Sequence, residues 1–223
     1  MLRRTVAEGL GTALLLAAVV GSGIMGDTLA PSNAALALLA NTIATGAALV
    51  ALILTFGPIS GAHFNPLVTL AEASQGSRPW REVPPYVVAQ VAGAFAGVAI
   101  AHVMFKQPAL FFASRHQRSG LPQLTSEFVA TFGLLAVIWG CGRRRPEAIP
   151  YAVGAYITAA YWFTASTSFA NPAVTLARAA SDTFAGIRPA DAPGFIVAQV
   201  AGAAAATALF RWLVPPSPKE KLP

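Results

Sequence analysis

Three sequence elements occur twice in this chain, in the same order, with apolar stretches in matching places between them. The paired segments are AEGLGTALLL (from Ala7) with SEFVATFGLL (from Ser126), HFNPLVTLAEA (from His63) with FANPAVTLARA (from Phe169), and PPYVVAQVAGA (from Pro84) with PGFIVAQVAGA (from Pro193). Chance is a poor explanation for three matches in one order, even in an alanine-rich chain. The repeat indicates an internal duplication, which any assignment of elements must respect.

Six apolar runs can cross the ~30 Å hydrocarbon core of a bilayer, if the shortest uses a few flanking residues. They cover residues 8–30, 33–55, 84–105, 126–142, 150–167 and 193–214. Charged residues make up only 11% of the chain, against ~25% in a typical soluble domain. Two shorter stretches, 65–74 and 171–180, are too short to span. The sequence therefore predicts an all-α membrane protein with six transmembrane helices and two half-helices.

Three spans in each copy mean that the second copy enters the membrane from the opposite side. We expect inverted repeats at about residues 4–105 and 124–214, within a single membrane domain that occupies residues 1–223. Matching interrupted segments of inverted repeats meet near the bilayer midplane, where non-helical backbone is tolerated if it is buried or lines a water-filled cavity. The two short stretches are expected to be those segments.

The net charge of +6 does not indicate a nucleic-acid-binding protein, because the basic residues lie between apolar runs rather than in one stripe. This distribution is typical of loops kept in the cytoplasm, and it predicts that both chain ends are cytoplasmic. The basic residues concerned are Arg3, Arg4, Arg78, Arg81, Arg143, Arg144, Arg145, Lys219 and Lys221.

The two Asn-Pro pairs have a chemistry that suits half-helices facing a pore. Asparagine is a preferred N-cap, and proline is a preferred first helical residue. If Asn65 and Asn171 cap their own half-helices with the amide oxygen, each NH₂ group is left free to donate to a passing solute. The positive ends of two half-helices also repel cations. One Asn-Pro is typical of an ordinary turn, but two at matching positions indicate a conduit for neutral, hydrogen-bonding solutes.

With these motifs the chain resembles the aquaporin and aquaglyceroporin family, the major intrinsic proteins, over about Arg4 to Val214. SGAHFNPLVTL is similar to the family's first signature, with Leu67 where alanine is usual, and FANPAVTLAR is similar to the second. The resemblance implies six tilted helices, two half-helices meeting at the centre, one pore per protomer and a homotetramer in the lipid bilayer. It also implies a passive channel with no cofactor.

The resemblance implies a selectivity filter, and one residue of this filter is unusual for the family. The family usually has an arginine directly after the second Asn-Pro-Ala, at the narrowest part of the pore, where this chain has Val174. Counting by the family pattern puts the other filter positions at Thr45, Ala159 and Ser168, with Thr158 as the alternative to Ala159. All of these side chains are small, which implies an opening wider than that of a strict water pore.

The predicted pore-lining set also includes Asn65, Asn171 and His63, although His63 either faces the pore or packs beneath it. The candidate solutes are water, glycerol-like polyols and arsenite. Bacterial relatives that lack the filter arginine are associated with arsenic resistance, and arsenite is neutral as As(OH)₃ near neutral pH. The resemblance to these relatives implies a multi-pass protein of the bacterial inner membrane.

Three other residues allow two interpretations each. Glu8 and Glu127 lie in apolar helices, where an ionisable group is a candidate functional site. Their repeat symmetry favours the alternative that each braces a half-helix loop by accepting backbone N–H bonds. Arg178 either replaces part of the missing filter charge or snorkels to the membrane interface, and we favour snorkelling. Tyr161 is expected on a helix surface.

Two other classes of protein compete with a channel. A membrane enzyme needs polar catalytic groups at one depth, but the three histidines are scattered and the sequence has neither an HExxH motif nor a catalytic carboxylate pair. The sequence therefore predicts neither catalytic residues nor a metal site. An ion-coupled secondary transporter also uses inverted repeats, but it needs an ion site or proton relay, for which Glu8 and Glu127 are the main candidates.

Overall fold

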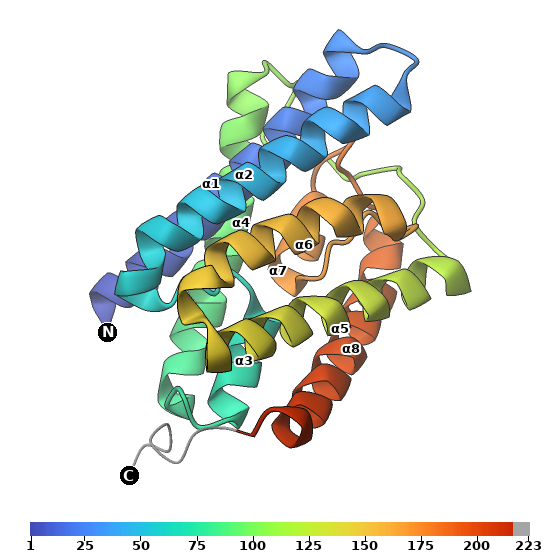
Figure 1. Cartoon of the computed structure of the whole chain (residues 1–223). Helices are drawn as coiled ribbons and strands as arrows, with labels where there is room; N and C mark the ends of the chain where they lie inside the picture. Colours follow the sequence, from blue (N-terminus) through green and yellow to red (C-terminus); the bar gives the residue numbers. More distant parts are fainter. Residues whose placement is uncertain (216–223) are drawn as a thin grey trace.

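The computed structural model describes residues 1–215, and every regular element in this range is helical (Figure 1). Lys219 and Lys221 lie outside the described residues. The long helices are α1 (Leu2–Leu29), α2 (Ala34–Ser60), α4 (Val83–Met104), α5 (Leu121–Arg144), α6 (Ile149–Phe163) and α8 (Ala192–Leu213). The half-helices are α3 (Pro66–Ser74) and α7 (Pro172–Arg178). The 3₁₀ turns η1 (Trp80–Glu82), η2 (Pro146–Ala148) and η3 (Pro189–Asp191) lead directly into α4, α6 and α8.

Each of the six predicted spans contains one long helix, so the prediction of six spans and two half-helices is confirmed. Five of these helices are long and apolar enough to cross a membrane. The sixth, α6, has 15 residues, which corresponds to roughly 22 Å of helix. The predicted end of this span at Thr167 was wrong, since α6 ends at Phe163. The serine and threonine side chains that follow bond to the local backbone, and such bonds compete with a helix.

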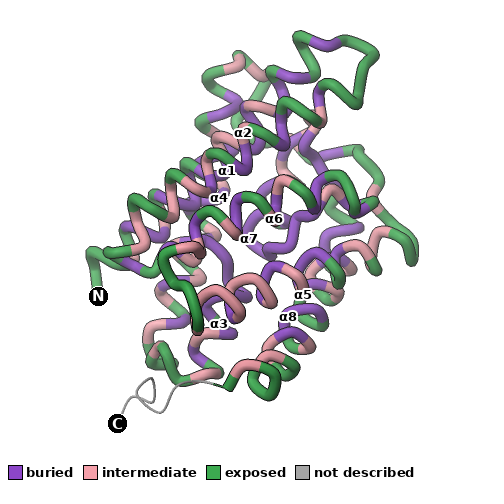
Figure 2. Tube along the Cα trace, in the orientation of Figure 1, coloured by how far each residue is buried: buried purple, intermediate pink, exposed green. Residues whose placement is uncertain are grey.

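The helix contacts occur twice, as expected of two copies with one fold. Helix α1 packs against α2 and α4, and α5 packs against α6 and α8 in the same way. Half-helix α3 contacts α4, and α7 contacts α8. Contacts between α2 and α6 and between α3 and α7 join the two halves. Figure 2 shows that buried residues gather on the inward faces around α7, while exposed residues follow the outward faces.

Two glycines at matching repeat positions allow the helices to approach closely. A Cβ atom on Gly93 would lie 2.1 Å from the carbonyl oxygen of Gly9 on α1. A Cβ atom on Gly202 would lie 2.4 Å from the carbonyl oxygen of Phe128 on α5. Both distances are below any van der Waals contact, so only glycine fits at these crossings. The repeated VAQVAGA segments therefore set the packing of α4 on α1 and of α8 on α5.

Gly93→Ala should destabilise the protein by about 1–3 kcal/mol, because the added methyl group must push α4 away from α1. Gly140→Ala in α5 is a matched control, since the nearest atom to its new Cβ is a Phe210 ring carbon at an ordinary 3.6 Å. That variant should be neutral or up to about 1 kcal/mol more stable, through better helix propensity. Thermal unfolding in detergent measures both. Equal midpoints for the two variants would contradict the close-approach argument.

Candidate functional site

Half-helices α3 and α7 begin at the two asparagines, and each asparagine caps its own helix. The side-chain oxygen of Asn65 accepts a hydrogen bond from the backbone N–H of Leu67 at 3.0 Å. The side-chain oxygen of Asn171 accepts from the N–H groups of Ala173 at 3.0 Å and Val174 at 3.3 Å. The predicted capping role of the Asn-Pro pairs is therefore confirmed, and Leu67 leaves it intact.

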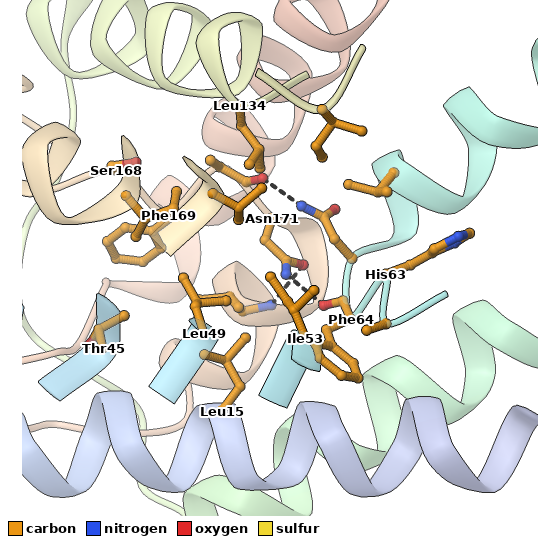
Figure 3. A pocket seen from close by; sticks show the side chains of 18 of the residues that line it. Leu15, Thr45, Leu49, Ile53, His63, Phe64, Leu134, Ser168, Phe169 and Asn171 are labelled. Carbon is orange, nitrogen blue, oxygen red and sulfur yellow. Dashed lines mark hydrogen bonds between the residues drawn. The ribbon is translucent and has the colours of Figure 1, made fainter. Parts of the chain in front are cut away.

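The amide nitrogens of the two asparagines connect the half-helices to each other (Figure 3). The Asn65 amide donates to the carbonyl oxygen of Ala170 at 2.8 Å, and the Asn171 amide donates to that of Phe64 at 2.7 Å. The expectation that each NH₂ group is wholly free was therefore wrong. One N–H of each amide holds the opposite loop, and the other has no protein partner within residues 1–215.

The loops before the two asparagines have the same unusual backbone. Ala62 and Phe64 have φ of 49°, and the corresponding Ser168 and Ala170 have φ of 51° and 49°. A residue other than glycine in this left-handed region costs roughly 1–2 kcal/mol. Such conformations persist only where the surroundings impose them, and they gather at functional sites. Both loops therefore need strong supports.

Two fully buried carboxylates supply those supports. Glu8 accepts from the backbone N–H groups of His63 at 3.0 Å and Phe64 at 2.8 Å. Glu127 accepts from Phe169 and Ala170, both at 2.9 Å. The bracing role favoured for these glutamates is confirmed.

A glutamine in each repeat completes the support. Gln90 donates to Glu8 at 2.8 Å and to Thr69 at 2.9 Å. Gln199 donates to Glu127 at 2.6 Å and to Thr175 at 2.9 Å. Sequence reasoning paired these glutamines across the repeats but assigned them no role. Their recurrence as polar residues within otherwise apolar helices was the available signal.

A cavity of about 310 Å³ lies where the half-helices meet. Its lining joins an apolar wall to a polar edge, and Figure 3 shows Asn171 close to the apolar side chains of that wall. The apolar wall includes Leu15, Val19, Leu49, Ile53, Leu134, Ile138, Ile149, Val153 and Ile157. The polar edge includes Thr45, His63, Asn65, Glu72, Arg78, Tyr161, Ser168, Asn171 and Arg178.

Most of the residues predicted to line a pore line this cavity. Thr45, Ser168 and Val174 do so from α2, the second loop and α7, and all three are buried. His63 lines the cavity with a half-buried side chain. Its ring points away from Asn171 in Figure 3, and its Nδ1 atom lies 3.0 Å from the Thr69 hydroxyl.

The prediction for Ala159 is wrong for this cavity, because Ala159 is exposed and does not line it. The contribution of α6 comes instead from Ile157 and Tyr161. These two residues are four apart and share a helix face. Ala159, midway between them, lies on the opposite face. The alternative, Thr158, is not in the lining either. Its hydroxyl bonds to Gly154 within α6 at 2.8 Å.

Two residues placed at the surface by sequence reasoning are in fact buried at this cavity. Tyr161 is 3% exposed and lines the cavity, where its hydroxyl lies 3.5 Å from that of Thr45. Arg178 is 2% exposed and also lines the cavity, so the snorkelling interpretation was wrong. The Nε atom of Arg178 donates to the carbonyl of Ala185. The loop that follows α7 therefore folds back over this arginine and covers it.

Metal-binding side chains do not cluster within residues 1–215. No group of three or more histidine, cysteine, aspartate or glutamate residues in this range could hold a metal ion. Cys141 is a partly buried free cysteine.

Comparisons with known proteins agree with this geometry. The family described as Major intrinsic protein matches residues 1–149 and 141–222. The chain is 59% identical over 215 residues to "Aquaglyceroporin AqpS" of Rhizobium meliloti (strain 1021), covering 96% of this chain and 91% of that protein. It is 40% identical over 140 residues to "Aquaporin NIP1-3" of Oryza sativa subsp. japonica, covering 60% of this chain and 49% of the relative.

A solved structure has the same fold. The X-ray structure of the aquaglyceroporin from Plasmodium falciparum matches with a TM-score of 0.74 at 24% sequence identity. The match covers 96% of this chain and 97% of the other.

Proposed function

Because the chain belongs to the major intrinsic protein family, we propose that it is a passive membrane channel for water and small uncharged solutes such as glycerol. The cavity of about 310 Å³ between the half-helices carries this proposal. Glycerol has C–H groups and hydroxyl groups, so an apolar wall beside a polar edge suits it. The similarity to a protein named aquaglyceroporin supports the same solute class.

In this proposal the cavity-lining residues have distinct roles. Asn65 and Asn171 each offer one N–H to a passing oxygen. Thr45, Ser168 and Val174 surround the narrow part of the pore, and His63 lies near one end. The small side chain of Val174 leaves room for solutes wider than water. Arsenite, as uncharged As(OH)₃, resembles a polyol in presenting hydroxyl groups, and we include it among the candidate solutes.

The burial and bonding of the glutamates favour a channel over an ion-coupled transporter. A coupled transporter needs a carboxylate that reaches the pathway and exchanges its proton or ion. Neither Glu8 nor Glu127 lines the cavity, and both accept backbone and glutamine N–H bonds. Their hydrogen-bonding capacity is used in holding the loops. Glu72 does line the cavity, but it lies near the C-terminal end of α3, away from the asparagine that caps this half-helix, and its carboxylate accepts a hydrogen bond from the Ser77 hydroxyl. No catalytic role is proposed for any residue.

The outer surface supports a proposal for the assembly and location of the protein. We propose one channel domain over residues 1–223, built from inverted repeats at about 4–105 and 124–214, in the bacterial inner membrane. The corresponding Val88 and Val197 are 67% and 70% exposed. Large apolar side chains on outward faces need lipid or a neighbouring protomer, which is consistent with a homotetramer in the bilayer.

Swelling of proteoliposomes that contain the purified protein tests this function across water, glycerol, urea and arsenite. A channel should accelerate water and glycerol entry in proportion to the solute gradient, with no dependence on an ion gradient. Rates equal to those of protein-free liposomes would refute the channel. Flux that saturates and requires an ion gradient would support the transporter instead.

Asn65→Ala and Asn171→Ala should both lower water and glycerol flux. Each variant loses a donor to the solute and a bond to the opposite loop, and the lost helix cap alone costs about 0.5–2 kcal/mol. Asn33→Ala is a matched control, because Asn33 caps α2 at an exposed position by accepting from Leu36 at 3.1 Å. It should keep normal flux. Normal flux in both pore variants at equal membrane abundance would contradict the proposed role.

A further inference from the structure

Arg178 is a buried cation without an acidic partner in the described part of the chain. It is 2% exposed, and a guanidinium group stays protonated in proteins. The ion pairs within residues 1–215 involve other arginines, at positions 4, 78, 115 and 188. An uncompensated buried charge is costly, and within a membrane it is by default a candidate functional group.

The surroundings of Arg178 hold its charge without neutralising it. The guanidinium carbon lies 3.4 Å from the centre of the Phe169 ring, and Nε donates to the Ala185 carbonyl. Arg118 approaches the same ring at 5.2 Å and donates to the carbonyl oxygens of Gly186 and Ser166. A ring face and carbonyl dipoles stabilise a cation but leave its net charge in place. Two guanidinium groups thus lie around the Phe169 ring against one carboxylate, that of Glu127, which accepts from the Phe169 backbone N–H. The region therefore carries a net positive charge.

The position of this charge matters because Arg178 lines the cavity, one helical turn beyond Val174 on α7. Residues four apart lie on the same face of a helix. A side chain at position 178 therefore faces the same passage as the one at position 174. The terminal nitrogens of Arg178 have no protein acceptor among residues 1–215, so they are available to a solute.

A second polar group at this place also lacks a partner. The Ser168 hydroxyl lines the same cavity, its residue is 3% exposed, and it has no hydrogen-bond partner within the described residues. An unsatisfied buried hydroxyl has a cost of about 1–3 kcal/mol. A passing solute with several oxygen atoms would satisfy both this hydroxyl and the guanidinium. The unpartnered hydroxyl is an independent sign of a solute subsite.

We propose that Arg178 is the fixed cation of this pore, which excludes cations and protons and, with the Ser168 hydroxyl, binds the oxygens of uncharged solutes in transit. The proposal rests on the channel function proposed above. It assigns selectivity by charge to Arg178 and selectivity by size to the space beside Val174. A cation that enters the passage meets an unneutralised guanidinium, while a neutral solute meets hydrogen-bond donors.

Urea and guanidinium form a suitable solute pair, because they have nearly the same size and planar shape and differ in charge. In proteoliposomes, the wild type should pass labelled urea and exclude labelled guanidinium. Arg178→Gln removes the charge and keeps a donor for the Ala185 carbonyl. We expect this variant to raise the ratio of guanidinium permeability to urea permeability by about tenfold or more. Proton leak under an imposed potential should rise in the same variant.

Two further variants separate charge from structure. Arg178→Lys keeps the cation and should keep the wild-type ratio. Arg188→Gln is the matched control, because Arg188 is 42% exposed, pairs with Asp191 at 2.8 Å and does not line the cavity. It should also behave as the wild type. A merely structural role for Arg178 would change both solute rates together and leave their ratio unchanged.

Each adverse outcome identifies what has failed. An unchanged ratio in Arg178→Gln, or a lysine variant that leaks as much as the glutamine variant, would overturn the role of the charge. Wild-type protein that passes guanidinium as fast as urea would overturn it without any variant, even if Arg178→Gln does not fold. Glycerol replaces urea as the neutral reference if urea is excluded by the wild type. Wild-type protein that passes none of water, urea and glycerol would refute the channel function itself.

Discussion

Glu127→Ala should destabilise the protein by about 3–5 kcal/mol and abolish a folded pore. The carboxylate accepts hydrogen bonds from the backbone N–H groups of Phe169 and Ala170 and from the Gln199 amide. Alanine would leave the two backbone N–H groups buried without an acceptor, and the Gln199 amide would keep only its bond to Thr175. The loop before Asn171 would also lose the support that holds Ala170 at a φ of 49°.

Glu147→Ala provides the control for this loss of a carboxylate, because Glu147 is exposed in η2. It should change stability by less than about 0.5 kcal/mol. Glu127→Gln should be intermediate, since an amide presents one oxygen and turns an N–H toward a backbone donor. The thermal midpoint of the purified protein in detergent measures the three variants. A Glu127→Ala midpoint equal to that of Glu147→Ala would show that the carboxylate does not brace the loop.

Val174→Arg should reduce glycerol and arsenite permeability by about tenfold or more, and water permeability much less. Val174 is buried and lines the cavity, so a guanidinium there occupies space that valine leaves open. Water needs less of that space than a polyol. The new cation would also lie one turn from Arg178, and the two charges would strengthen the barrier to cations.

Val174→Leu separates volume from charge in this experiment. It should lower glycerol flux moderately and leave the exclusion of guanidinium ions unchanged. Swelling rates for water and glycerol, measured at equal protein content, give the comparison. If Val174→Arg reaches the membrane and passes glycerol and arsenite as well as the wild type does, then Val174 does not lie at the narrow part of the pore.

The sequence was informative where the two repeats agree. A residue type that recurs at matching positions has to satisfy the same local geometry twice. The capping by Asn65 and Asn171 and the bracing by Glu8 and Glu127 were predictable for this reason. The half-helices were predictable from length alone, because about ten residues cannot cross a bilayer.

The direction in which a single side chain faces was less predictable from the sequence. Ala159 was assigned to the pore by counting along the chain, whereas the face that α6 turns inward carries Ile157 and Tyr161. A shift of two positions reverses the face of a helix, and helix ends are uncertain from sequence by about that amount. Tyr161 was placed at the surface because tyrosine and tryptophan side chains commonly anchor to lipid headgroups.

By itself, then, the sequence determined the number of spans, their duplication and the chemistry of the Asn-Pro pairs, because length, apolar content and capping act locally. Only the tertiary structure decided what fills the centre. The asparagine amides each lose one N–H to the opposite loop, and Arg178 is enclosed by Phe169 and Ala185 rather than extended to the interface. These contacts join residues that are distant in the chain or lie in a folded-back loop, and no local pattern encodes which groups meet there.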